Sequence, residues 1–169
     1  MSFLKRLFGG GQKPGPQRGD EMDSEAFWTI LDRVSRASKR PRERARSLQR
    51  ELQSCTPEQI ARFDHLFDER IEESYTWELW GAAYVIRGGC GDDGFEYFRN
   101  WLISEGRKVF EKALRDPDSL ADLPRIEDAE NEAFGYVAQE VYEELTGGDF
   151  PPSRVARSSE PRGKEWEEE

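Results

Sequence analysis

Apolar residues recur every three or four positions along most of the chain, which is the spacing that places side chains on one face of an α-helix. The pattern predicts helices that begin near residues 23, 41, 57, 76, 93 and 126, with a short helical turn at 117–120. The third, fourth and last of these helices are expected to end near residues 75, 87 and 145. The predicted fold class is therefore an all-α, single-domain bundle of about six or seven helices with a Gly/Asp-rich interhelical loop.

Helix starts are marked by residues that can cap the free backbone N–H groups. The strongest signal is Thr56 followed by Pro57 and Gln59, which is the pattern of a capping box with proline in the first turn. Asp93, with Glu96 three residues later, is predicted to cap the fifth helix. Gly106 interrupts the stripe of that helix, as a close-packing point or as a bend.

The fourth predicted helix is apolar around most of its circumference, which is typical of a central, buried element. Within it, Val85 and Ile86 also fit a short strand, although the alternation there is poor. The apolar positions of this helix are Trp77, Trp80, Ala83 and Tyr84.

Both ends of the chain differ in composition from the helical part. The sequence predicts an amphipathic peptide with a flexible linker over residues 1–22, a helical domain over 23–148 and a disordered acidic tail over 149–169. The N-terminal peptide is too short to be a stable helix alone in water; it is a frayed terminus or a weak docking element for a membrane surface or a partner's groove. Its apolar residues are Phe3, Leu4, Leu7 and Phe8.

The formal charge of −10 argues against a nucleic-acid-binding protein, which presents a basic face to phosphates, and it favours a basic protein partner. No apolar run reaches the roughly 20 residues of a membrane-spanning helix. Cys55 and Cys90 do not form a metal-ligand pair, so we expect a reducing, cytoplasmic location, no metal and no cofactor. The only histidine, His65, lies beside an inward stripe and is expected to pack; a thiol–imidazole pair with Cys90 is the catalytic alternative.

The loop at residues 88–94 contains four glycines and two aspartates. Glycine-rich loops that open onto a helix N-terminus bind anions, but Asp92 and Asp93 put negative charge where a phosphate would lie. A divalent cation held by Asp92, Asp93 and Glu96 is an alternative, although their spacing differs from that of a calcium-binding helix–loop–helix. The structural interpretation is a tight turn between two helices.

Aromatic residues flank this loop on both sides. Two helices joined by a short turn pack antiparallel, so we expect the rings to converge near one end of the pair, either in the core or on a binding surface. Tyr and Trp are enriched at recognition surfaces. The candidate binding surface consists of Trp77, Trp80, Arg87, Cys90, Asp92, Asp93, Glu96, Tyr97, Arg99 and Trp101.

The stretch at residues 75–103, with its Trp, Gly-Gly-Cys, Asp-Asp and Phe-Arg-Asn-Trp-Leu elements, resembles the bacterial domain-of-unknown-function family number 4240, common among actinobacteria. The similarity begins around residues 25–28 and continues through 117–120 to 131–134. The resemblance implies no activity that can be carried over, and some members look like accessory modules fused to other domains.

The leading hypothesis is a non-enzymatic interaction or regulatory domain that binds its partner through the aromatic and acidic surface around the loop. The alternative is an enzyme or ligand-binding protein, with or without a metal, that uses a pocket formed by carboxylates and arginines at the same loop. That alternative predicts a concave site where carboxylates converge from more than one helix. Its residues are Arg87, Asp92, Asp93, Glu96 and Arg99.

Overall fold

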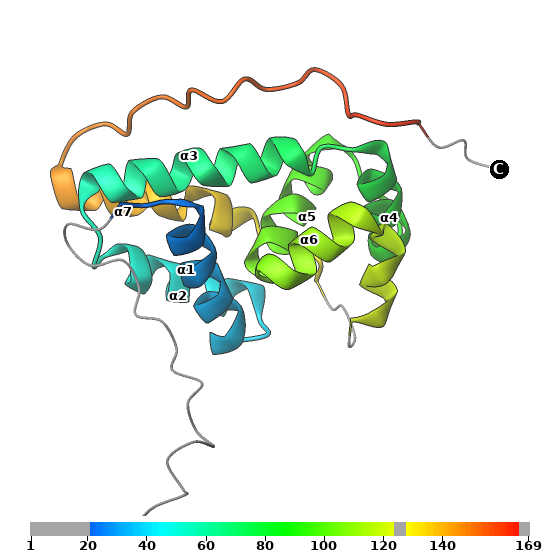
Figure 1. Cartoon of the computed structure of the whole chain (residues 1–169), viewed down its shortest axis with the longest axis horizontal. Helices are drawn as coiled ribbons and strands as arrows, with labels where there is room; N and C mark the ends of the chain where they lie inside the picture. Colours follow the sequence, from blue (N-terminus) through cyan, green and yellow to red (C-terminus); the bar gives the residue numbers. More distant parts are fainter. Residues whose placement is uncertain (1–20, 124–127, 166–169) are drawn as a thin grey trace, which may run out of the picture.

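The structure is a computed structural model that describes residues 21–123 and 128–165 (Figure 1). The predicted amphipathic peptide at residues 3–8 lies outside these ranges. Within them the chain is an all-α bundle, as the sequence predicts. None of the helices in these ranges combines the length and the apolar composition that a membrane-spanning helix needs. The helices, with η for 3-10 helices, are α1 (Ser24–Ala37), α2 (Pro41–Leu52), α3 (Pro57–Glu73), α4 (Trp77–Arg87), α5 (Asp92–Ser104), α6 (Arg107–Arg115), η2 (Pro117–Asp122), η3 (Glu132–Tyr136) and α7 (Val137–Thr146).

The long helix α3 organises the bundle. It runs along one side of the molecule, with α7 beside it, α1 and α2 below one half and α4, α5 and α6 around the other half (Figure 1). The predicted inward stripes form one continuous core, in which aromatic rings from different helices meet. The ring pairs are Phe27–Phe63 at 4.9 Å, Trp28–Phe110 at 5.3 Å and Phe67–Phe134 at 6.0 Å between centroids.

The capping box at the start of α3 forms as predicted. The backbone N–H of Gln59 donates to Thr56 Oγ1 at 3.3 Å, and the backbone N–H of Thr56 donates to Gln59 Oε1 at 2.8 Å. Because both groups are satisfied locally, the start of α3 is fixed by its own sequence.

The start of α5 differs from the prediction. Gly91, not Asp93, occupies the N-cap, and Asp92 and Asp93 lie in the first turn of the helix. Carboxylates in a first turn still interact favourably with the positive end of the helix dipole, so the acidic signal is compatible with a helix start one or two residues earlier.

Gly106 is both a close-packing point and a break. It has φ +92°, and a Cβ at this position would lie 2.7 Å from Asp32 Oδ1. The same carboxylate oxygen accepts the backbone N–H of Arg107 at 2.9 Å, which starts α6. The single predicted helix is therefore two helices joined at Gly106.

Helix α4 lies at the edge of the bundle, which corrects its prediction as a central element (Figure 1). Leu79 and Ala83 are buried, whereas Val85 is 81 % exposed. The alternative of a strand at residues 85–86 is also wrong, because α4 continues to Arg87. Trp80 stacks on Phe95 of α5 and also contacts the ring of Tyr75, while Tyr84 and Val85 of the same helix are exposed.

The last helix begins at Val137 rather than near residue 126. Asp128 has φ +55° and therefore cannot belong to a helix, and the backbone N–H of Asn131 donates to the carbonyl of Tyr97 on α5 at 3.0 Å. The N–H of Asn131 is therefore bonded to a distant part of the chain and not to a carbonyl four residues earlier, as it would be in a helix.

Candidate functional site

The loop at residues 88–94 is held by the aromatic stack beneath it. Trp80 stacks on Trp77 at 5.4 Å and on Phe95 at 4.9 Å between ring centroids, so α4 and the start of α5 share one ring system. The indole Nε1–H of Trp80 donates to the carbonyl of Cys90 at 2.8 Å. The tryptophan side chain thus fixes the backbone of the loop, which is a structural task.

Arg87 and Cys90 close the loop from its other side. The Arg87 guanidinium donates to the carbonyl of Gly94 and pairs with Glu130. A Cβ at Gly94 would lie 2.8 Å from Arg87 Nη1, so a larger residue there would require the guanidinium to move. Burial raises the pKa of the Cys90 thiol, although the nearby Arg87 opposes this effect. A raised pKa leaves less of the reactive thiolate at neutral pH.

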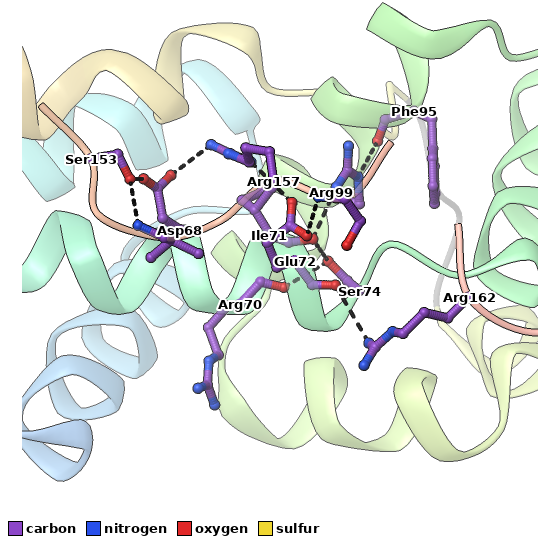
Figure 2. Close-up of polar contacts among 12 residues, drawn as sticks. Asp68, Arg70, Ile71, Glu72, Ser74, Phe95, Arg99, Ser153, Arg157 and Arg162 are labelled. Carbon is purple, nitrogen blue, oxygen red and sulfur yellow. Dashed lines mark hydrogen bonds and ion pairs between the residues drawn. The ribbon is translucent and has the colours of Figure 1, made fainter. Parts of the chain in front are cut away.

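Arg99 and Trp101 belong to the core. Arg99 is 6 % exposed and lies over the rings of Tyr75 and Phe95, with Cζ 4.7 and 4.8 Å from their centroids. Its Nη1 donates to the carbonyl of Ile71 at 2.9 Å, near the C-terminal end of α3 (Figure 2). Burial lowers the pKa of this guanidinium. Trp101 is 3 % exposed and packs against Phe98, so it cannot contact a partner.

An open cavity of about 370 Å³ lies between the end of α3 and the start of α5. Its carboxylates come from both helices: Glu72 from α3, and Asp92, Asp93 and Glu96 from α5. This is the convergence of carboxylates that the pocket hypothesis predicts. The remaining lining residues are Tyr75, Arg99, Arg157 and Ser158.

The structure thus brings together four of the ten predicted site residues: Asp92, Asp93, Glu96 and Arg99. Of the other six, Arg87 and Cys90 hold the loop, Trp77 and Trp80 form the aromatic stack, Trp101 lies in the core, and Tyr97 lies elsewhere on α5. The Tyr97 hydroxyl donates to Glu132 Oε1 at 3.1 Å, at η3.

Residues 149–165 form an extended segment along α3, which we call the C-terminal strap (Figure 1). The sequence predicts a disordered acidic tail over residues 149–169; in the structure, residues within 149–165 make hydrogen bonds and ion pairs with α3. Ser153 Oγ donates to Asp68 Oδ2, and Arg157 Nη2 donates to Asp68 Oδ1 at 2.7 Å (Figure 2). The backbone N–H of Ser158 donates to Glu72 Oε2 at 3.0 Å. The strap has no helical or strand periodicity of its own, and its position is defined by contacts with the distant helix α3.

The far end of the strap is held by backbone pairing. The N–H of Arg162 donates to the carbonyl of Tyr75 at 3.0 Å, and the N–H of Trp77 donates to the carbonyl of Arg162 at 2.9 Å. The Arg162 guanidinium donates to the carbonyl of Glu73 at 2.5 Å, where helix α3 leaves its last carbonyls without helical partners (Figure 2).

A second cavity, of about 400 Å³, lies further back along α3 under the start of the strap. Asp64 and His65 line it, opposite Phe150 and the residues that follow. Burial and the neighbouring Asp68 raise the pKa of Asp64 to about 7, although Arg157 opposes the shift. His65 pairs with Glu69 at 3.2 Å. His65 and Cys90 therefore have different neighbours, and no thiol–imidazole pair is formed.

Four residues that line the cavity were not among the candidates predicted from the sequence: Glu72, Tyr75, Arg157 and Ser158. One signal was available: Asp64, Asp68 and Glu72 follow one another at four-residue spacing, which aligns three carboxylates on one face of α3. A row of carboxylates on one helix face is stable only if water or a cationic group lies against it, and the arginines of the C-terminal strap are such cationic groups.

In the described ranges, no group of three or more His, Cys, Asp or Glu side chains is placed to hold a metal ion.

Comparison with known proteins identifies one family. The family described as "Protein of unknown function (DUF4240)" matches residues 22–144, which span the helical bundle and exclude the strap. No curated protein and no solved structure matches the chain.

Proposed function

The chain belongs to the family of proteins of unknown function DUF4240, and because that description assigns no activity, we propose a function from the geometry of the cavity. The protein is a non-enzymatic interaction or regulatory domain. It binds a basic protein partner at the cavity beside the 88–94 loop, through the carboxylates of α3 and α5.

The observation that carries this proposal is the unbalanced charge of the cavity. Asp92, Asp93 and Glu96 form no ion pair within residues 21–123 and 128–165, and all three are exposed. A lysine or arginine from a partner would find several carboxylates around one concavity, which favours both rapid encounter and correct register. The net charge of −10 adds a long-range attraction for the same partner.

The aromatic part of the predicted surface contributes indirectly. Trp80 and Phe95 stack under the loop and fix the position of Asp92 and Asp93 relative to α3. A binding site held on a rigid support loses less conformational entropy on binding than a site on a free loop. Tyr75 is the ring that lines the cavity itself.

The second candidate is a small-ligand-binding protein or enzyme at the same cavity. The convergence of carboxylates from two helices beside Arg99 favours it. Against it, Arg99 uses N–H groups to hold the carbonyls of Ile71 and Phe95, so its guanidinium serves the fold. The only histidine, His65, lines the other cavity. Among the residues that line this site, the groups capable of general acid–base catalysis are therefore the carboxylates and the Tyr75 phenol.

The setting that we propose is the cytoplasm of a bacterium. Cys55 and Cys90 are both free thiols, and Cys55 is buried, which fits a reducing compartment.

The N-terminal peptide with Phe3, Leu4, Leu7 and Phe8 is a second docking element in this proposal. Deleting residues 1–8 and comparing flotation with liposomes tests that part, and equal flotation of both chains would count against it.

The decisive experiment is affinity capture from a bacterial lysate, followed by titration with the purified partner. Asp92→Asn/Asp93→Asn removes two charges from the cavity. The matched control, Glu140→Gln/Glu144→Gln, removes two exposed charges from α7. We expect the cavity variant to bind the partner at least about tenfold more weakly at low salt and the control to bind normally.

Equal binding by all three chains would refute the cavity as the docking site. If none of the chains captures a partner, but metal ions or nucleotides raise the melting temperature of the wild type and not of the cavity variant, the ligand-binding alternative replaces this proposal.

A further inference from the structure

The C-terminal strap is an intramolecular example of the ligand that this acidic face accepts. We propose that the face of α3 from Asp68 to the end of the helix is a groove for an extended, arginine-containing segment of a partner protein, and that the strap occupies this groove until the partner displaces it. The inference rests on the proposed interaction function and specifies its partner and its regulation.

Charge complementarity is the first argument. Between Pro151 and Lys164 the strap carries three arginines and one lysine against one glutamate, in a chain whose net charge is −10. Two of the three arginines meet acidic or electronegative groups of α3: Arg157 binds the Asp68 carboxylate and lies 3.9 Å from Glu72, and Arg162 binds the carbonyl of Glu73. The last turn of a helix carries partial negative charge, so it attracts arginine even where no carboxylate is present.

The manner of binding is that of an extended peptide. The strap contains no helix, and it adds one parallel bridge, between Thr76 and Arg162, to a backbone that otherwise lacks β-structure in the described ranges. Backbone pairing at one end with side-chain slots along the rest is how extended peptides are recognised by many domains. Beside the bridge, Gly163 has φ +91°, a backbone conformation that favours glycine, and a Cβ there would meet the Glu78 carboxylate.

The strap is attached by polar contacts and not by core packing. From Pro151 to Glu165 its residues are exposed, apart from the half-buried Val155 and Pro161. Each partly exposed ion pair or hydrogen bond contributes only about 0.5–1.5 kcal/mol. A segment held in this way opens locally without unfolding the bundle. The family match covers residues 22–144, so the strap is not part of the region that the family shares.

The strap leaves part of the acidic site unused. Arg157 and Ser158 form one wall of the cavity, while Asp92 and Asp93 lie on its α5 side without an ion pair in the described ranges. A partner segment that replaces the strap and carries a further arginine or lysine at this point would pair with Asp92 and Asp93 of α5 as well as with the acidic face of α3. It would therefore bind more strongly than the strap residues that it replaces.

The test uses the full chain and a fluorescent peptide of residues 151–164 as the probe. In the wild type the attached strap is present at an effective concentration on the order of millimolar, so added peptide competes poorly. Arg157→Ala/Arg162→Ala loosens the strap and leaves the groove intact. The matched control, Arg154→Ala/Lys164→Ala, removes the same charge from strap residues that form no ion pair within the described ranges.

We expect the loosened chain to bind the peptide at least about tenfold more tightly than the wild type and the control, as measured by fluorescence anisotropy. Adding Asp68→Asn/Glu72→Gln to the loosened chain should abolish this binding, with helix content unchanged by circular dichroism. Amide exchange at Ser158 and Arg162 reports whether the strap has been released.

Three results would overturn the inference: unchanged exchange in the loosened chain, a released strap without tighter peptide binding, or equal binding after Asp68 and Glu72 are neutralised. These outcomes are separate from those of the Asp92/Asp93 experiment. Partner capture that depends on Asp92 and Asp93 but not on the strap would leave the proposed function standing without the displacement mechanism.

Discussion

Arg157 reaches from the C-terminal strap to Asp68 in the middle of α3, and its Nη2 lies 2.7 Å from Asp68 Oδ1 (Figure 2). The two side chains are unequally covered, with 11 % of the Asp68 side chain exposed and 48 % of the Arg157 side chain. An ion pair with one covered partner is stronger than a fully exposed pair, because the carboxylate is less well hydrated. This contact links the strap to the bundle.

The first prediction is a graded release of the strap by substitutions at Arg157. Arg157→Ala removes the contacts to both Asp68 and Glu72, whereas Arg157→Lys keeps a charge near Asp68 but loses the planar fork of donors. We expect the amides of Ser158 and Arg162 to exchange about tenfold faster in the alanine variant, with the lysine variant in between. Hydrogen–deuterium exchange measures this. Exchange rates equal to the wild type in both variants would show that the ion pair does not hold the strap.

Local patterns predicted the bundle well. The capping box at Thr56 and Gln59 and the inward stripe of α3 depend on residues within one or two turns of each other, so the sequence specifies them directly. The loop acids Asp92 and Asp93 were singled out for the same reason. The N-cap predicted at Asp93 lies two positions earlier, at Gly91, which puts Asp93 in the first turn.

The features that the sequence did not reveal depend on contacts between distant segments. The strap has the proline, serine and charge content of a disordered tail, and only the row of carboxylates on α3, about 90 positions earlier, gives it a defined place. Helix α4 was expected at the centre because its composition is apolar, but composition does not tell which neighbours cover it. Glu72 and Tyr75 reach the cavity only because α3 ends beside the start of α5.

The second prediction concerns the break between α5 and α6. Gly106→Ala places a Cβ 2.7 Å from Asp32 Oδ1 at a φ of +92°, so the carboxylate that caps Arg107 must move. We expect a loss of about 2–3 kcal/mol in the free energy of unfolding, measured with urea. Gly148→Ala is the control, since a Cβ there would meet nothing closer than Thr146 Oγ1 at 3.8 Å. A Gly106→Ala protein as stable as the control would contradict the close approach.

The third prediction separates a structural role of Arg99 from ligand binding. Arg99→Lys keeps the charge but loses the stacking on Tyr75 and Phe95 and one or both hydrogen bonds to the carbonyls of Ile71 and Phe95. We expect the free energy of unfolding to fall by about 2 kcal/mol, whereas Arg36→Lys at an exposed position of α1 changes it by less than about 0.5 kcal/mol. Unchanged stability of the Arg99 variant would return this guanidinium to the list of candidate ligand-binding groups.

The fourth prediction is a dependence of stability on pH that originates at Asp64. Burial and Asp68 raise the pKa of Asp64 to about 7 in the folded chain, and Arg157 opposes the shift. Since aspartate titrates near 4 in an unfolded chain, the folded state holds an extra proton between about pH 4 and pH 7. The contribution of Asp64 to stability therefore falls as the pH rises through this window and is least favourable above it.

The comparison of the wild type with Asp64→Asn isolates this effect, because asparagine has a similar shape and does not titrate. The other charged groups at the same cavity, Arg62, His65 and Arg154, are common to both chains, so the difference in stability between the chains reports on position 64. We expect the asparagine variant to gain stability relative to the wild type as the pH rises from about 4 to about 7, and the gain to stay constant above that range. Urea unfolding at several pH values measures it. A difference that does not vary with pH would place the Asp64 carboxylate in water and not under the strap.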